Sequence, residues 1–224
     1  MDGAELGAVE QEKDLGVQIH QSLKPGVQIA AAAKKANQIL GQILRAFTYR
    51  DKVHFIKLFT SRVRCHLEYA VQAYSPWLQK DIDLLESVQR RAVRQVRGLH
   101  GTYEEKLKQW GLTLLEDRRV RGDLIQTFKI VNQIDDLPVE TFFKMAEERH
   151  SHATHRQVTI VPGDTPEEED RVDNRNFVKQ QAKGEIRRNF FSFRVVDQWN
   201  NLPSAIKNAE NVNNFKNLYD SWVK

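Results

Sequence analysis

Cysteine is nearly absent from this sequence: Cys65 is the only one in 224 residues. A single cysteine excludes a disulfide framework and a cysteine-based zinc finger within the chain, and it favours a reducing compartment. No apolar run approaches the roughly 20 residues that a membrane-spanning helix needs. The first twelve residues are acidic and lack the apolar centre of a secretory signal. These absences predict an intracellular protein, in the nucleus or the cytoplasm, with no membrane contact.

Recognisable catalytic motifs are also missing. The sequence has no glycine-rich phosphate loop, no nucleophile elbow and no dinucleotide fingerprint. Asp135-Asp136 could suggest a magnesium site, but the pair runs into Leu137-Pro138 and is better explained as the loop that ends a helix. Three histidines near residue 150 lack the spacing and the further ligands that a metal site requires. We therefore expect no catalytic residues, no metal and no cofactor.

Charge is present in both signs but is unevenly distributed. The whole chain has 34 Lys and Arg against 30 Asp and Glu, a net charge of +4. Between residues 24 and 99 there are 14 basic and 5 acidic residues, whereas residues 162–175 contain 6 acidic and 2 basic ones. A basic half followed by an acidic connector indicates an anionic partner more strongly than the net charge does.

Apolar periodicity predicts a mainly helical fold. The alternation of Leu15, Val17 and Ile19 is typical of a short strand over residues 14–20. Apolar residues at helical spacing then predict helices over 27–47, from a cap at Asp51 to about 67, from a cap at Asp81 to 97, over 103–110, and from a Thr113 capping box to 134. A last helix is expected over 212–223.

These elements suggest four parts. Residues 1–23 form a flexible N-terminus with the short β segment, and residues 24–145 form a helical bundle. Residues 146–175 have no periodicity and are rich in acidic residues, which predicts a disordered connector. Residues 176–224 form a small helical C-terminal segment with many aromatic side chains.

The strongest candidate binding site is a group of four arginines. On a helix reaching residue 97, Arg90, Arg94 and Arg97 would share one face, with Arg91 beside them, and such a row can follow a phosphate backbone. The alternative is an ordinary solvated helix face. Few acidic residues lie nearby in the sequence to neutralise the row of arginines, which favours the binding interpretation. Weaker candidates are Lys34, Lys35 and Arg45 on the first long helix, and Arg187 and Arg188, which precede a run of aromatic residues.

The order of several short motifs resembles the region that follows the catalytic palm in LINE-type (non-LTR, Jockey-like) retrotransposon reverse transcriptases. The motifs are Asp14-Leu15-Gly16-Val17, Lys34-Lys35-Ala36-Asn37-Gln38-Ile39-Leu40-Gly41, His66-Leu67-Glu68-Tyr69-Ala70, Ser75-Pro76-Trp77, Leu85-Glu86-Ser87-Val88-Gln89-Arg90-Arg91-Ala92, Trp199-Asn200-Asn201-Leu202-Pro203 and Phe215-Lys216. The resemblance covers nearly the whole chain, from about residue 12 to 222.

The resemblance implies that residues 14–19 are the last strand at the palm edge and that residues 27–97 belong to the thumb, which grips the template–primer duplex. It implies RNA or an RNA–DNA duplex as the partner, bound through its backbone. The family's catalytic aromatic-Ala-Asp-Asp turn and its upstream aspartate are not found in this sequence. The expectation is therefore a fragment of an RNA-directed DNA polymerase that does not polymerise by itself. The alternative is a repurposed helical protein–protein interaction module, which associates with a protein partner or with itself through an exposed palm-facing surface around Leu15, Val17 and Ile19.

Overall fold

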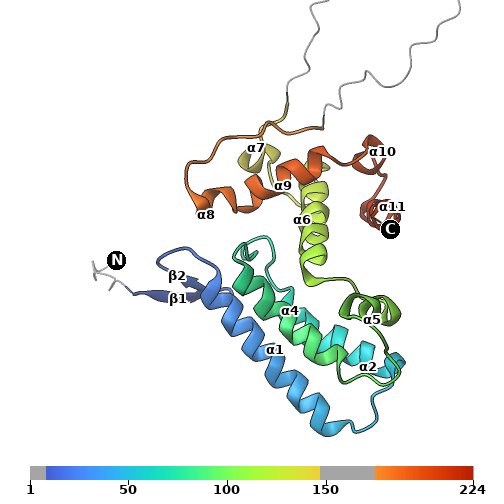
Figure 1. Ribbon diagram of the computed structural model, residues 1–224. Helices are drawn as coiled ribbons and strands as arrows, with labels where there is room; N and C mark the ends of the chain where they lie inside the picture. Colours follow the sequence, from blue (N-terminus) through green and yellow to red (C-terminus); the bar gives the residue numbers. More distant parts are fainter. Residues whose placement is uncertain (1–8, 147–174, 224) are drawn as a thin grey trace, which may run out of the picture. The chain divides into compact units, whose positions relative to one another are not determined.

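The computed structural model describes residues 9–146 and 175–223, and these are mainly helical, with one short two-stranded sheet (Figure 1). This confirms the fold class predicted from apolar periodicity. The chain forms two compact units: Met1–Asp123 with Ala182–Phe193, and Leu124–Gln181 with Arg194–Lys224. The division into parts at residues 24–145 and 176–224 stays a prediction, and the expected disordered connector falls almost wholly outside the described residues.

The N-terminal β segment is a hairpin. Strand β1 (Gln11–Asp14) pairs antiparallel with β2 (Val17–His20), and Asp14 lies opposite Val17. Leu15 and Gly16 form the turn with φ of 44° and 85°, the left-handed backbone that tight hairpin turns require. The strand predicted over residues 14–20 is therefore confirmed only over Val17–His20, and residues 11–13, predicted as flexible, form β1 with Asp14. Leu15 is 85% exposed at the turn, Val17 is buried and Ile19 is half-buried, so they do not form the expected exposed apolar surface.

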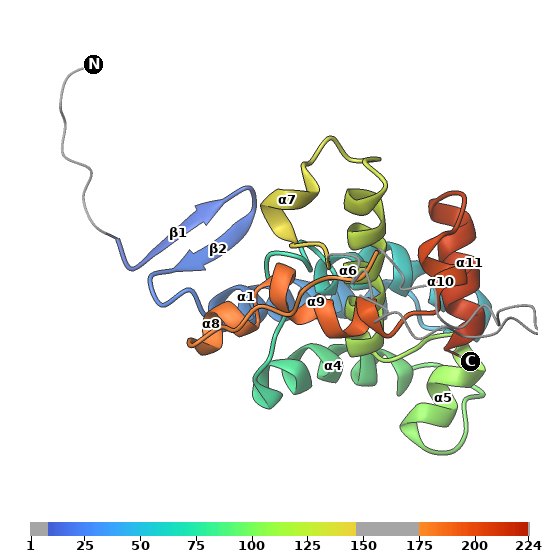
Figure 2. The same cartoon turned by 90° about the horizontal axis from the view of Figure 1, so that it is seen from above.

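The first unit is built mainly from helices that follow the hairpin. They are α1 (Gly26–Ala46), α2 (Lys52–Leu58), the π-helix η1 (Phe59–Arg64), α3 (Cys65–Leu67), α4 (Gln79–Val93) and α5 (Tyr103–Trp110). The unit also contains the start of α6 (Leu115–Val131) and the short α8 (Glu185–Arg188). Figures 1 and 2 show the hairpin beside the start of α1.

Helix α1 buries the stripe that its sequence predicts, since Ile29, Ala33, Ala36, Leu40 and Ile43 all lie in the core. The two alanines are at most 1% exposed, and side chains this small let α4 approach closely. The apolar stripe is therefore a packing surface, and it leaves the polar residues of α1 on its other sides.

The same core contains a cluster of three aromatic side chains, Phe55, Phe59 and Trp110. The Trp110 ring lies 5.9 Å from the Phe55 ring and 5.4 Å from the Phe59 ring, centroid to centroid. The indole Nε1 of Trp110 donates to the carbonyl oxygen of Lys52 at 3.0 Å. This satisfies the one polar atom of a side chain that is 3% exposed. Helix α5 is thereby tied to α2 and η1.

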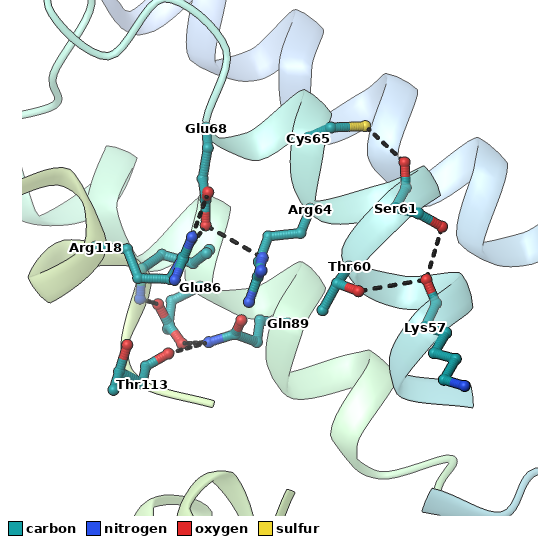
Figure 3. Close-up of polar contacts among 11 residues, drawn as sticks. Lys57, Thr60, Ser61, Arg64, Cys65, Glu68, Glu86, Gln89, Thr113 and Arg118 are labelled. Carbon is teal, nitrogen blue, oxygen red and sulfur yellow. Dashed lines mark hydrogen bonds and ion pairs between the residues drawn. The ribbon is translucent and has the colours of Figure 1, made fainter. Parts of the chain in front are cut away.

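The segment from Asp51 to Leu67 is not one regular α-helix. Asp51 caps α2 as predicted, by accepting from the backbone N–H groups of Val53 and His54. The helix then widens into a π-turn at η1, where the Ser61 hydroxyl donates to the Lys57 carbonyl at 2.6 Å (Figure 3). A hydroxyl that takes a backbone carbonyl in this way competes with the regular α-helical pattern.

Helix α4 differs from its prediction at both ends. Asp81 is not its N-cap: the cap is Leu78, without a side-chain hydrogen bond, and Asp81 lies in the first turn, 6% exposed. The helix ends at Val93 and not at residue 97. The N–H groups of Gln95 and Val96 bond to the carbonyls of Ala92 and Val93, three residues back, which tightens the chain into turns. Val96 is still buried, which explains why the apolar stripe suggested a longer helix.

The second unit is organised by stacked aromatic rings. It contains the end of α6, α7 (Val139–Phe142), most of α9 (Phe191–Asn200), α10 (Ser204–Lys207) and α11 (Val212–Trp222). The ring centroids of Phe143 and Phe177 are 4.2 Å apart, those of Phe177 and Trp199 are 5.6 Å apart, and Phe215 lies 4.6 Å from Phe128. Phe177, Trp199 and Phe215, which belong to the aromatic-rich C-terminal segment, are therefore buried together.

No helix within residues 9–146 and 175–223 combines the length and apolarity needed to cross a membrane.

Candidate nucleic-acid interface

The candidate interface rests on two helices that run in the same direction. A methyl group at Gly26, the first residue of α1, would lie 3.6 Å from Asp81 Oδ2 in the first turn of α4. About three turns further along both helices, Arg91 Nη1 donates to Asn37 Oδ1 at 3.0 Å. These two contacts set the register of α1 and α4, which lie side by side in Figure 1.

The four arginines of the main candidate group do not share one helical face, which corrects the predicted row. Arg90 and Arg91 lie in the last turn of α4, Arg94 is its C-cap, and Arg97 lies in the following turn before Gly98, whose φ is +80°. All four are exposed. They form a cluster around the end of α4, where positive charge also offsets the negative end of the helix dipole.

Two of these guanidinium groups stack on tyrosine rings. Arg90 Cζ lies 4.9 Å from the centroid of Tyr103, and Arg97 Cζ lies 5.6 Å from that of Tyr49. Stacking on a ring face restricts a guanidinium and leaves its N–H edges free to donate in the plane. The arrangement therefore suits recognition of an anionic oxygen from the side.

Arg50 fixes the loop that brings Tyr49 to this cluster. Its guanidinium donates to Gln95 Oε1 at 3.2 Å and to the carbonyl oxygens of Leu44 and Phe47 at 3.0 and 3.1 Å. The carbonyl oxygen of Arg50 also accepts from the N–H of Arg97 at 3.0 Å. Arg50 thus ties the end of α1 to the turns after α4, a role that its sequence position did not indicate.

The lysines of α1 point to different sides. Lys34 precedes Asn37 by three residues, so it lies on the side of α1 where Arg91 docks. Lys35 instead lines a pocket beside the β-hairpin. Arg45 is exposed in the last turn of α1. Lys34 thus shares the side of α1 that Arg91 contacts, whereas Lys35 lies beside the hairpin.

Arg187 and Arg188 are exposed on α8, which belongs to the same unit as α1 and α4. Arg187 Cζ lies 5.0 Å from the centroid of the Phe193 ring. The neighbouring Phe190 is 55% exposed, whereas Phe191 is buried. The aromatic run is thus divided between core and surface.

Three other arginines of the first unit lie partly or fully inside the fold. Glu68 lies between Arg118, with which it forms a two-point pair, and Arg64, whose Nε is 3.4 Å from Glu68 Oε1 (Figure 3). Burial, reinforced by the nearby charge of Arg118, lowers the pKa of Arg64. Burial likewise lowers the pKa of Arg119, which is 4% exposed. Arg64 and Arg118 thus hold Glu68 between them at partly buried positions, and Arg119 is buried.

By contrast, the candidate cations at the surface form no ion pair with a carboxylate in the part of the chain that the structure describes. Within residues 9–146 and 175–223, no ion pair joins a carboxylate to Lys34, Lys35, Arg45, Arg90, Arg91, Arg94, Arg97, Arg187 or Arg188. Unpaired guanidinium and ammonium groups on one surface raise the local potential, which attracts polyanions. This absence of pairing distinguishes the surface cations from Arg64 and Arg118, which pair with Glu68.

The aspartate pair considered as a metal site has structural contacts at one member. Asp135 Oδ2 accepts from Gln126 Nε2 at 2.7 Å, and its Oδ1 lies 3.6 Å from Lys129 Nζ. Among the described residues, no group of three or more His, Cys, Asp or Glu side chains is arranged to hold a metal ion. His150, His152 and His155 lie outside the described residues.

No protein-family model, curated protein or solved structure matches this chain.

Proposed function

We propose that the first unit binds the phosphate backbone of RNA or of an RNA–DNA duplex without reading base sequence. The observation that supports this most directly is the cluster of Arg90, Arg91, Arg94 and Arg97, exposed and unpaired with carboxylates in the described structure. Planar guanidinium groups suit phosphate oxygens, and backbone contacts supply affinity without sequence information. Lys34 lies beside this cluster, and Arg45, Arg187 and Arg188 add positive charge to the same unit.

The resemblance to the thumb and C-terminal region of LINE-type reverse transcriptases supports the same proposal, because the thumb of such an enzyme grips a duplex by its backbone. On this proposal the chain contributes binding and not catalysis. The sequence offers no motif for a polymerase centre. The half-buried Glu68 is bound by Arg118, and the buried Glu86 accepts from the N–H of Leu115. Their oxygens therefore serve the fold.

The test is a titration of the full chain against a labelled RNA–DNA hybrid at two salt concentrations. The test variant replaces Arg90, Arg91, Arg94 and Arg97 with Gln. A matched control replaces four other exposed basic residues of the first unit, Lys24, Lys52, Lys57 and Lys80, with Gln. We expect salt-sensitive binding that the arginine variant loses and the control largely keeps.

Two results would overturn the proposal. One is the absence of binding at low salt, and the other is equal loss in the test and control variants, which would indicate only a diffuse effect of net charge. Binding that persists at high salt would instead favour the alternative, a helical protein-interaction module that uses apolar surface. A thermal unfolding curve for each variant verifies that the loss is not one of folding.

A further inference from the structure

A pocket of about 530 Å³ lies between the β-hairpin, α1 and α3. This volume falls in the range of about 300–1,000 Å³ that is usual for small-molecule sites. Three basic side chains from three different elements line it: Lys13 of β1, Lys35 of α1 and His66 of α3. Among the residues that the structure describes, no carboxylate lines the pocket. Segments far apart in sequence thus bring nitrogen bases together around one hollow.

The hairpin register explains why only basic and neutral groups face this pocket from β1. Lys13 lies directly opposite Gln18, so both side chains lie on the same face of the hairpin, and both line the pocket. Glu12 and Asp14 flank Lys13 in sequence, and they lie on the opposite face because strand side chains alternate. Consistent with this, Asp14 lies close enough to Tyr74 for its charge to help burial raise the pKa of that phenol.

Helix α1 contributes Gln28, two alanines and a cation to the pocket. The Gln28 side chain accepts from the N–H of Gln18 at 2.8 Å, so its oxygen is already bonded to the hairpin. Ala31, Ala32 and Lys35 line the pocket from one side of the helix, at the spacing of three and four residues that shares a helical face. Methyl side chains leave room where larger residues would fill the hollow. The pocket therefore combines an apolar floor with a basic rim.

Tyr69 provides an aromatic wall that is held in place. Its hydroxyl donates to the carbonyl oxygen of Leu15 at 2.7 Å, across 54 residues of sequence. A methyl group at Gly16 would lie 3.5 Å from that hydroxyl, so the turn passes close to the ring. The Tyr69 residue remains 54% exposed, although its polar atom is bonded. The rest of the ring is thus available for contact with a flat ligand.

We propose that this pocket binds a nucleotide, with its phosphate between Lys13, Lys35 and His66 and its base against Tyr69 and the alanine floor. A bare phosphate would use the basic rim alone, whereas a nucleoside would use only the floor and the ring. The proposal does not depend on duplex binding, which is assigned to the arginines at the end of α4.

The experiment measures binding of AMP, adenosine and inorganic phosphate to the full chain by isothermal titration calorimetry. We expect AMP to bind more tightly than either of the other two. Lys13→Gln and Lys35→Gln should each weaken AMP binding about tenfold, because each removes one charge-assisted hydrogen bond. Lys34→Gln is the matched control, since it makes the same change at the adjacent position of α1 but does not line the pocket. It should leave AMP binding within about twofold of the unsubstituted chain.

Three outcomes would overturn the proposal: no saturable AMP binding at millimolar concentration, equal affinity for AMP and either fragment, or equal weakening by Lys34→Gln and Lys35→Gln. His66→Gln provides a second, independent probe of the rim and should also weaken AMP binding. The variant with four arginines replaced should retain AMP binding. Failure of duplex binding and failure of the nucleotide pocket can therefore be told apart.

Discussion

The carboxylate of Glu86 on α4 accepts a hydrogen bond from the backbone N–H of Leu115, the first residue of α6, at 3.0 Å. Glu86 is 7% exposed and also accepts from Gln89 Nε2 at 2.9 Å and from the hydroxyl of Tyr103. Burial and the hydrogen bond to Glu86 raise the pKa of Tyr103, which keeps this phenol a donor. One buried carboxylate thus joins α4, α5 and the start of α6.

Replacing Glu86 with Ala should therefore destabilise the protein strongly. The change leaves the buried Leu115 N–H and the half-buried Tyr103 hydroxyl without this acceptor, and we expect a loss of about 3 kcal/mol in the free energy of unfolding. Glu86→Gln keeps the shape and one acceptor, and should lose roughly half as much. Urea denaturation followed by circular dichroism measures both. Glu104→Ala, at an exposed position of α5, is the control, and Glu86→Ala being no more harmful than this control would contradict the prediction.

The capping carboxylate of Asp51 should make the stability of the protein depend on pH. The backbone N–H of His54, with the His54 ring and the N–H of Val53, holds the pKa of this capping carboxyl below its ordinary value. A carboxyl with a lowered pKa in the folded state stabilises the fold above its unfolded pKa of about 3.9, and this contribution is lost as pH falls through the folded pKa. Asp51→Asn keeps a capping oxygen but cannot ionise.

We therefore expect the melting temperature of the unsubstituted chain to fall relative to that of Asp51→Asn as pH drops from about 5 to below 3. Asp51→Ala removes the cap and should melt below both proteins at neutral pH. Thermal melts across this series measure the difference. If the melting temperatures of the unsubstituted chain and Asp51→Asn differ by the same amount at every pH, the Asp51 charge does not contribute to stability.

Local signals in the sequence predicted most helices, because they need no knowledge of distant residues. The 3.6-residue stripe of α1 and the capping oxygen of Asp51 act within one or two turns. The hairpin was missed because Leu15 adopts a left-handed backbone that is unusual for leucine, so its residue type gave no turn signal. The end of α4 was missed because buried Val96 continues the apolar stripe after the helical hydrogen bonds stop.

The candidate site was less predictable, because it depends on contacts between segments far apart in sequence. Stacking of Arg97 on Tyr49 and the anchoring by Arg50 join the loop after α1 to the turns after α4. The pocket lined by Lys13 and His66 likewise requires the hairpin register and the docking of α3. Sequence spacing identified the basic residues as candidates but did not indicate which of them converge.

Asn200 should be essential to the second unit for a reason that its sequence does not show. Its side chain accepts from the Phe177 N–H and donates to the Phe177 carbonyl oxygen, both at 2.9 Å, as a neighbouring strand would. Asn200→Asp replaces the donor with a second anionic oxygen facing that carbonyl. We expect a loss of about 2 kcal/mol in the free energy of unfolding, measured by urea denaturation. Asn201→Asp, at the exposed neighbouring position, should change it by less than about 0.5 kcal/mol. Equal effects would contradict the proposed pairing.

The salt dependence of hybrid binding tests the arginine cluster one residue at a time. Each phosphate contact releases condensed counterions, so removing one contact should lower the slope of log K against log salt by about 0.9 on B-form DNA and by a comparable amount on a hybrid. Arg94 is the most informative choice, because its side chain makes no hydrogen bond or stacking contact with the described residues. Its replacement should therefore leave the fold intact. We expect Arg94→Gln to reduce the slope, and Arg94→Lys to restore most of it because the charge returns. Lys57→Gln, an exposed change on α2, should leave the slope unaltered. A slope unaffected by Arg94→Gln would place the bound phosphates elsewhere on the unit.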